Sequence, residues 1–291
     1  MTQASRLRNV LDKITDLPTL PTVVTQIMHI VNDPRSSAKL LAGVISHDQS
    51  LTAKVLRVVN SAFYGFPRPI TSVHQATAIL GYNAIKNMAL SVAVFSAFGS
   101  GSDGPFSRDK FWSHAAAVGS VARLLARKVK YHELEEAFIA GLIHDIGKVL
   151  LDEYFHDDFM KAVGLAKEKN ILILSAERAQ LGFDHTAVGQ FLARKWNLPR
   201  TLYDVIVHHH DLPSDPSALG PAIRLVAIVH VADIMVRGLQ IGDPGDNLVP
   251  RTNMELWKEL NLGREEIVAV KEKIPEEVAK AEEFLKISKE D

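Results

Sequence analysis

The sequence contains no cysteine, carries almost no net charge, and has no apolar run long enough to form a membrane helix. The absence of cysteine excludes disulfides, thiolate zinc sites and thiol nucleophiles, so any bound metal ion must be held by histidines and carboxylates. A net charge of −1 and a pI of about 6.9 provide no basic field that would attract nucleic acid or an anionic membrane.

Two further absences concern membranes and secretion. The longest apolar run, residues 222–236, is interrupted by Arg224, His230 and Asp233 and is too short to span a bilayer. Residues 1–17 are polar and charged and lack the apolar core of a signal peptide. We therefore expect a cytoplasmic protein that does not associate with membranes. Its 291 residues, 47% of them hydrophobic, are enough for one large or two smaller globular domains.

Apolar residues recur at helical spacing along most of the chain, and strand-like alternation is nearly absent, which predicts an all-α fold. The first half predicts short helices near residues 7–14, 23–31, 36–45, 50–59, 71–80 and 85–95, with Ser50 as a cap. The second half predicts helices near residues 107–130, 133–151, 159–169, 174–181, 185–196, 201–210 and 218–239, then two amphipathic helices within 254–287.

A glycine- and serine-rich linker at residues 99–105 divides the chain. We expect an N-terminal multi-helix bundle at residues 1–98, a metal-binding helical domain at 106–240, and C-terminal amphipathic helices at 241–291.

The chain is organised around residues 141–148, GLIHDIGK. His144 and Asp145 offer an imidazole nitrogen and a carboxylate oxygen side by side, which together can bind one divalent ion. The glycines on either side allow another backbone, or a phosphate, to approach closely. A single His-Asp pair is common by chance, so the interpretation requires further ligands.

Further candidate ligands lie in or at the ends of the helices expected after the linker: His114, His185, His209, His210 and Asp233. Imidazoles and carboxylates together favour iron, manganese, zinc or nickel over calcium. Each residue also has a structural alternative. His114 can be a buried core histidine, His185 a helix-start histidine, and His208 to His210 a solvated helix end. Asp233, costly to bury alone, can pair with His230 one turn earlier.

In their order along the chain, His114, the His144-Asp145 pair and Asp233 resemble the H…HD…D signature of the HD superfamily of metal-dependent phosphohydrolases. That resemblance implies that these four residues hold one metal ion. His185, His209 and His210 resemble the extra ligands of the HD-GYP branch, which implies a second ion bridged by Asp145. It also implies that Lys148 contacts a substrate phosphate, so that Lys148 and Asp145 would be catalytic. The Gly-Tyr-Pro element of HD-GYP enzymes is missing after Asp211, which argues against cyclic-dinucleotide hydrolysis.

The first half of the chain narrows the resemblance to the HDOD domain, an HD-related output domain. The segments that carry it are LPTLP at residues 17–21, SLTAKVLRVVNSAFY at 50–64, residues 70–81, and WNLP at 196–199. The similarity covers roughly residues 7–239. It implies a bacterial signal-transduction protein of regulatory type, and the retained ligands predict one or two divalent metal ions, with iron or manganese favoured and zinc or nickel as alternatives.

Several functional interpretations stay open. The favoured one is a regulatory protein whose partners are signalling proteins. The alternatives are a metal-dependent phosphohydrolase acting on a phosphoester or nucleotide, in which a bimetal centre activates a water, and a di-iron redox or gas sensor. Under the regulatory interpretation, Phe63, Tyr64 and the loop 66–69 are candidates for a plug over the metal site. A basic patch of Lys54, Arg57, Arg68 and Lys86 is the weak case for nucleic acid.

Overall fold

The computed structural model describes residues 22–33, 35–99 and 104–289, and within these ranges it contains helices and no β-strand. The all-α prediction is therefore confirmed. The helix expected near residues 7–14 and the LPTLP segment at 17–21 lie outside the described residues. No described helix is both long enough and apolar enough to cross a membrane.

The first half of the chain forms short helices close to the predicted positions. Their bounds are α2 Thr22–Asn32, α3 Ala38–His47, α4 Gln49–Asn60, α5 Val73–Leu80 and α6 Tyr82–Phe98. Ser37, Asp48 and Ser72 cap α3, α4 and α5, each accepting a hydrogen bond from a backbone N–H of the first turn. The prediction of Ser50 as a cap was wrong. Asp48 accepts from Leu51 N at 2.8 Å, and Ser50 lies inside the helix that Asp48 caps.

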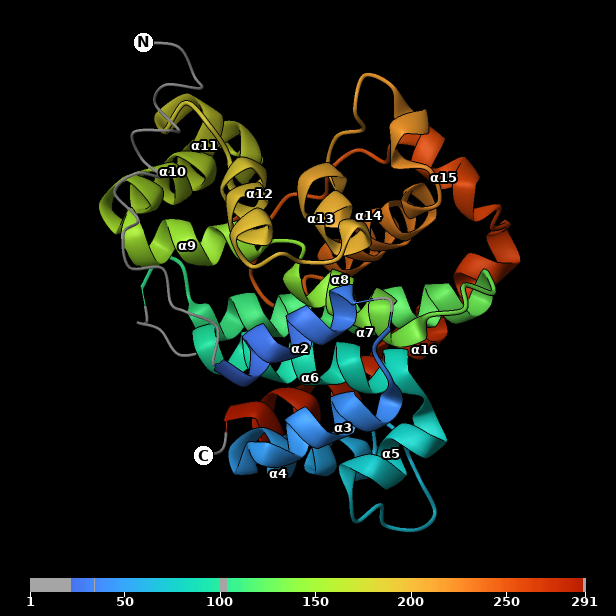
Figure 1. The fold of residues 1–291 in the computed structure, drawn as a ribbon. Coiled ribbons are helices and arrows are strands. Elements are labelled where there is room, and N and C mark those ends of the chain that lie inside the picture. The colour runs from blue at the N-terminus through green and yellow to red at the C-terminus, as the bar shows by residue number, and fades with distance from the viewer. Residues whose placement is uncertain (1–21, 34, 100–103, 290–291) are drawn as a thin grey trace.

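The second half continues the helical pattern. Its elements are α7 Arg108–Lys128, α8 Leu134–Ile143, α9 Ile146–Tyr154, α10 His156–Lys169, α11 Ile173–Gln180, α12 His185–Lys195, α13 Arg200–His208, the 3-10 helix η1 Pro216–Leu219, α14 Ala222–Gly238, α15 Met254–Leu260 and α16 Arg264–Lys289. Helices α7 and α8 run across the middle of the molecule, with α9 to α14 above them and α3 to α5 below them in Figure 1.

The backbones of α7 and α8 touch where two glycines face each other. A Cβ added to Gly141 of α8 would lie 2.7 Å from both Cα and N of Gly119 on α7. No larger residue fits at such a separation, so this contact sets the position of α8 against α7. The His144-Asp145 pair follows directly at the end of α8 and is fixed by the same contact.

A second glycine contact holds α9 against α12. A Cβ on Gly147 would overlap the carbonyl oxygen of His185, the first residue of α12. The two glycines that border the His-Asp pair thus admit neighbouring backbone. Gly147 in particular brings the start of α12, and with it His185, beside Asp145.

The last helix, α16, packs against α7 in the second half and against α4 and α6 in the first half. Its residue Phe284 contacts both Phe63, which follows α4, and Phe138 of α8. Lys54 of α4 is buried and its Nζ donates to the backbone oxygen of Ser288 at 3.2 Å. The weak case for a basic patch is reduced further, because Lys54 is buried beneath the C-terminal helix and Lys86 is partly buried.

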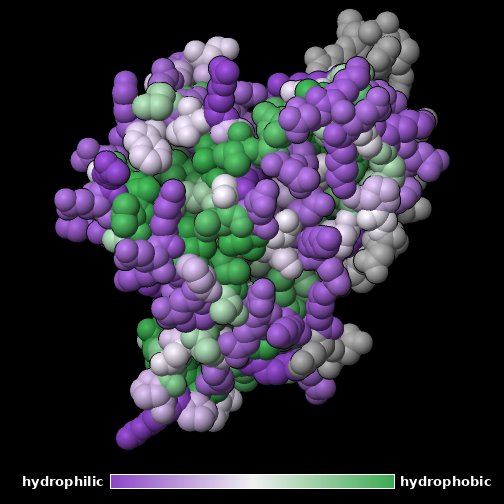
Figure 2. All heavy atoms as spheres, turned by 180° about the vertical axis from the view of Figure 1, so that it is seen from behind, coloured by the Kyte–Doolittle hydropathy of each residue, from purple (hydrophilic) through white to green (hydrophobic). Residues whose placement is uncertain are grey.

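Residues 254–287 form two amphipathic helices, as predicted, with apolar side chains such as Leu256, Ile274 and Phe284 buried. A few large apolar side chains on this part of the chain stay exposed, among them Met254 and Val268. Figure 2 shows the face opposite to that of Figure 1, where hydrophobic residues gather in the middle between hydrophilic ones.

Candidate metal centre

His144 and Asp145 lie in the tight turn between α8 and α9, and both side chains are fully buried. Asp145 is the second residue beyond α8, and its carboxylate points toward the start of α12 and the end of α13. The turn between the two helices thus places a histidine and a carboxylate side by side in the interior, where a charged group requires partners.

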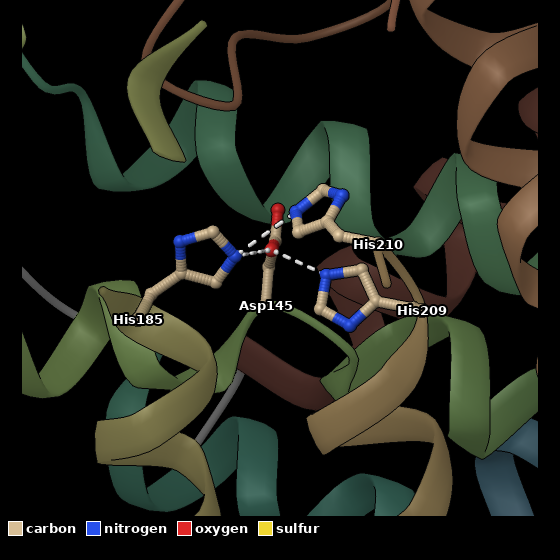
Figure 3. Close-up of side chains that lie close together, drawn as sticks. All are labelled: Asp145, His185, His209 and His210. Carbon is tan, nitrogen blue, oxygen red and sulfur yellow. Dashed lines mark hydrogen bonds and ion pairs between the residues drawn. The ribbon is translucent and has the colours of Figure 1, made fainter. Parts of the chain in front are cut away.

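The first cluster of candidate ligands surrounds Asp145 (Figure 3). His185 from the start of α12 and His209 and His210 from the end of α13 point at its carboxylate, and the four potential ligand atoms lie within 4.8 Å of one another. His185 Nε2 is 3.0 Å from Asp145 Oδ1, and His209 Nε2 is 3.4 Å from the same oxygen. His185 Nε2 and His210 Nε2 are 3.1 Å apart. Four ligand atoms converge here from three separate elements.

The second cluster consists of His114 from α7, His144, and Asp233 from α14, again with ligand atoms within 4.8 Å of one another. His114 Nε2 is 3.0 Å from Asp233 Oδ1, and His144 Nε2 is 3.9 Å from that oxygen. His144 Nε2 also lies 3.3 Å from Oδ2 of Asp145, so the two clusters adjoin at the His-Asp pair. The structure thus brings together all seven residues that the sequence nominated as metal ligands.

The orientation of the imidazoles suits metal binding. The Nδ1 atoms of His114, His144 and His209 each lie 2.7 to 3.2 Å from a backbone carbonyl oxygen, of Ile241, Gly141 and Val205 respectively. Because a carbonyl only accepts, each Nδ1 must carry the proton, which leaves a lone pair on Nε2 facing inward. Metal-bound histidines are held in this way by the partner of their outer nitrogen.

Three inward-facing atoms confirm that polar groups here are not satisfied by the protein alone. His144 Nε2, Asp145 Oδ1 and His209 Nε2 are buried and make no hydrogen bond with any described residue. Buried polar atoms without partners are costly, and a divalent ion accepting lone pairs from imidazole and carboxylate would satisfy all three. The donor set therefore fits a transition metal.

Electrostatics keep most of these groups in the form that binds metal. Burial lowers the pKa of His209 to about 4 and that of His210 well below its usual value, so both are neutral near pH 7. Burial alone would raise the pKa of Asp145, but the charges of His144, Lys148 and His185 bring it well below its usual value. Burial alone would also raise the pKa of Asp233, but the charge of Arg237 is the main cause that brings it well below its usual value.

Glu177 of α11 supports the first cluster and was not anticipated from the sequence. It is fully buried, and its Oε2 accepts from His185 Nδ1 at 2.7 Å and from the His185 backbone N–H at 2.9 Å. Burial opposes the cation of His185, yet the charges of Glu177 and Asp145 raise its pKa to about 9. The eight-residue separation between Glu177 and His185 spans a turn, so no helical spacing signals this contact.

The partner of Asp233 also differs from the expected one. Arg237, one turn later on α14, donates to both carboxylate oxygens, whereas His230 donates to the backbone oxygen of His209 at 2.8 Å. The prediction of His230 as partner of Asp233 was wrong, because Arg237 lies at i+4 on the same helix and brings a full charge. His230 instead fixes the end of α13 on which His209 lies.

Lys148 is fully buried, and its Nζ donates to Oδ2 of Asp145 at 2.6 Å. Its ammonium therefore lies beside the carboxylate of the first cluster, on the side away from His185 and His209, which face Oδ1.

The predicted plug lies elsewhere in the molecule. Tyr64 donates to Glu135 at the start of α8, and Phe63 packs on Phe138 in the middle of the same helix. His144 follows the other end of α8. At the helical rise per residue, it lies about 13 Å along the helix axis from Glu135. Phe63 and Tyr64 therefore do not cover the metal ligands.

Comparisons with known proteins agree on one family. The HDOD domain matches residues 17–212. An HDOD domain protein of unknown function from Geobacter sulfurreducens has the same fold, with a TM-score of 0.82, 28% identity, and coverage of 97% of this chain and 98% of its own. A protein from Shewanella amazonensis SB2B, provisionally named a phosphohydrolase, shares the fold with a TM-score of 0.71, 23% identity, and coverage of 96% and 97%.

A curated relative from Treponema pallidum (strain Nichols), an uncharacterized protein, is 27% identical over 259 residues. The alignment includes 88% of this chain but 49% of the relative, so the chain spans about half the length of that relative. Since the family match covers most of the chain and agrees with the fold and with the order of the buried ligands, the resemblance seen in the sequence is confirmed: the chain belongs to the HDOD domain family.

Proposed function

We propose that this protein is a regulatory HDOD protein whose interior binds one or two divalent transition-metal ions. The observation that carries the proposal is the convergence of seven candidate ligands. Six of them are buried and His210 is partly exposed, and three have an inward-facing atom with no hydrogen-bond partner among the described residues. Protein alone leaves these atoms unsatisfied, and a metal ion supplies what they lack.

The ligand chemistry favours iron or manganese, with zinc or nickel as alternatives, because the donors are imidazoles and carboxylates and no thiolate is available. An ion in the first cluster would tie the α8–α9 turn to α12 and α13, and an ion in the second would tie the same turn to α7 and α14. The ion would therefore hold elements that the chain otherwise joins only by packing, and its presence would set the shape of the surface offered to signalling proteins.

Burial of the ligands favours regulation over catalysis. His114, His144, Asp145 and His209 are all at most 1% exposed, and Lys148, which would contact a substrate phosphate, is occupied by Asp145. A catalytic metal needs an open coordination position that a substrate can reach. The burial of these ligands and the contact of Lys148 with Asp145 suit a structural metal site rather than a catalytic one.

A metal-dependent phosphohydrolase is the second candidate, favoured by the two ligand clusters that adjoin at the His144-Asp145 pair. In HD enzymes such a centre supplies a metal-activated water. Two residues of this chain would have a role beside it. Asp145 would bridge the two clusters, and Lys148 would release Asp145 and neutralise a phosphate oxygen. A Shewanella amazonensis protein of the same fold, 21% identical, is provisionally named a metal-dependent phosphohydrolase.

Elemental analysis tests the metal centre. We expect between one and two transition-metal ions per chain in the purified protein and loss of metal in the His209→Ala and Asp145→Ala variants. His208→Ala is the matched control, because His208 precedes His209 on α13 but does not belong to either cluster. Absence of metal above background after reconstitution under reducing conditions would refute the proposal.

Hydrolysis assays separate the two candidates. The metal-loaded protein is incubated with p-nitrophenyl phosphate and bis(p-nitrophenyl) phosphate, beside the Lys148→Met variant. Turnover by the wild type that is lost in the variant would establish the phosphohydrolase and displace the regulatory proposal. Full metal occupancy without turnover is the result we expect.

A further inference from the structure

A cleft of about 510 Å³ lies between the two halves of the chain, away from the metal ligands. One wall is the start of α6, and the other is formed by Arg123 near the end of α7 and by the first residues of α8. We name it the α6–α8 cleft. Its volume is within the range of small-molecule binding sites.

The α6 wall offers hydrogen-bond donors. Gly81 precedes the helix with a φ of +88° and has no side chain to cap it. The backbone N–H groups of Tyr82, Asn83 and Ala84 have no acceptor among the described residues. Free N–H groups at the start of a 17-residue helix attract a negative charge.

Arg123 provides a second and independent set of donors. It is only 8% exposed, its guanidinium lies 4.4 Å from the ring centre of Phe63, and its Nε donates to Glu135 Oε1 at 2.9 Å. Its two terminal amino groups have no hydrogen-bond partner within the described part of the chain, although the side chain lines the cleft. These donors on a largely buried guanidinium can bind a ligand in the cleft, and a carboxylate matches their geometry.

A negative charge lies beside the start of α6. Glu133 lines the cleft, and its Oε1 accepts from Asn83 Nδ2 at 2.8 Å, while its Oε2 has no donor among the described residues. Glu135 is different, because both its oxygens are occupied, one by Arg123 and one by the hydroxyl of Tyr64. The cleft therefore presents the donors of α6 and Arg123 close to one carboxylate oxygen, Oε2 of Glu133, that has no donor among the described residues.

This arrangement of charges selects the class of ligand. A simple anion such as phosphate would meet the repulsion of Glu133, and a simple cation would meet Arg123 and the start of α6. A zwitterion satisfies the donors and the neighbouring carboxylate at once. Leu80, Leu134 and Tyr64 also line the cleft and offer apolar surface for a side chain.

We propose that the α6–α8 cleft binds a free α-amino acid, whose carboxylate lies at the start of α6 and at Arg123 and whose ammonium group lies at Glu133. The cleft is distinct from the metal centre, since its residues Glu133 and Glu135 are at the start of α8 and His144 follows the end of that helix. The proposal does not depend on metal binding.

The first experiment measures the melting temperature of the full chain with each of the twenty amino acids at millimolar concentration, followed by calorimetric titration of those that raise it. We expect at least one to raise the melting temperature and bind. Its N-acetyl and amide derivatives, which lack the ammonium and the carboxylate respectively, should bind at least tenfold more weakly. Failure of all twenty, or equal binding of either derivative or of inorganic phosphate, would overturn the proposal.

A pair of variants at one position locates the site. Ala84→Asp places a carboxylate among the free N–H groups of α6, which suits the helix start but occupies the position of the ligand carboxylate. We expect this variant to fold, with a melting temperature no lower than that of the wild type, and to lose at least tenfold in affinity. Ala84→Asn, of the same shape but neutral, should retain affinity within threefold. Equal affinities for the two variants would place the ligand elsewhere.

Discussion

Arg237 Nε donates to both carboxylate oxygens of Asp233, at 3.0 and 3.1 Å, while Oδ1 of Asp145 faces Nε2 of His185 at 3.0 Å and Nε2 of His209 at 3.4 Å. The two clusters therefore differ in what they offer to a cation. Asp233 must give up part of its interaction with Arg237 to bind metal, whereas the imidazoles that face Oδ1 of Asp145 are themselves candidate ligands.

This difference predicts two unequal affinities. We expect the first equivalent of metal to bind at Asp145, His185, His209 and His210, and a second to bind at least tenfold more weakly at His114, His144 and Asp233. Titration of the metal-free protein with Mn²⁺, followed by electron paramagnetic resonance, measures both steps. His114→Ala should remove only the weaker step and His209→Ala the tighter one. Equal loss of both steps in either variant would contradict this order.

Glu177 should tune the first cluster through His185. Replacement by Gln keeps an oxygen for His185 Nδ1 but removes the negative charge that raises the pKa of that imidazole. Outer partners of metal-bound histidines are typically worth roughly 10- to 100-fold in affinity, so we expect Glu177→Gln to weaken the tighter metal step by about tenfold. Glu168→Gln, on the exposed face of α10, is the control. An unchanged affinity would show that Glu177 has no influence on the ligand.

Glycine at position 147 should be required for the site to assemble. Gly147→Ala forces α9 away from the backbone of His185, so we expect destabilisation by several kcal/mol, on the order of core overpacking, together with loss of metal. Gly164→Ala on α10 meets nothing within 4 Å and should instead raise stability by roughly 0.5–1 kcal/mol. Urea denaturation measures the free energy of unfolding of both variants. A Gly147→Ala protein as stable as the wild type would disprove the close approach of Gly147 to the backbone of His185.

Alkaline pH should destabilise the protein through two tyrosines. Burial raises the pKa of Tyr64 well above its usual value, with Glu135 adding to the effect, and burial with Glu136 raises that of Tyr131. A group whose pKa is higher in the folded state stabilises it fully below the unfolded pKa, about 10 for tyrosine. That contribution is lost as pH rises above 10, because the unfolded chain then releases the proton first.

The measurement compares urea unfolding of wild type and Tyr64→Phe at pH 9, 10 and 11. We expect stability to fall less steeply above pH 10 in the variant, which has no phenol to ionise at this position. The other tyrosines and the lysines are common to both proteins and cancel in the comparison. Parallel decline of the two curves would show that Tyr64 ionises equally in the folded and unfolded states.

The sequence predicted the helices and the family because both depend on local pattern. Apolar spacing and capping residues are read within one or two turns, and the order of His114, His144-Asp145 and Asp233 needs no knowledge of packing. The predictions that were wrong each involved a choice between neighbours. Asp48 rather than Ser50 caps α4, and Arg237 rather than His230 binds Asp233, because in each case a carboxylate or guanidinium forms the stronger bond.

Contacts between residues far apart in the chain could not be predicted from the sequence pattern. Glu177 approaches His185 across a turn, and Lys54 meets Ser288 at a separation of 234 residues. Neither spacing has a periodic signature. The plug expected at Phe63 and Tyr64 failed for the same reason, since only the packing of α4 and α16 on α8 decides which end of α8 these rings reach.

The position of α16 has a consequence for how the chain is made. Residues near 284–288 complete the packing around Phe63 and Lys54, which leave the ribosome more than two hundred residues earlier. Until α16 emerges, the apolar surfaces of α4, α6 and α7 that it covers face water. Between the synthesis of α4 and that of α16, the nascent chain therefore exposes an apolar surface to which a chaperone can bind.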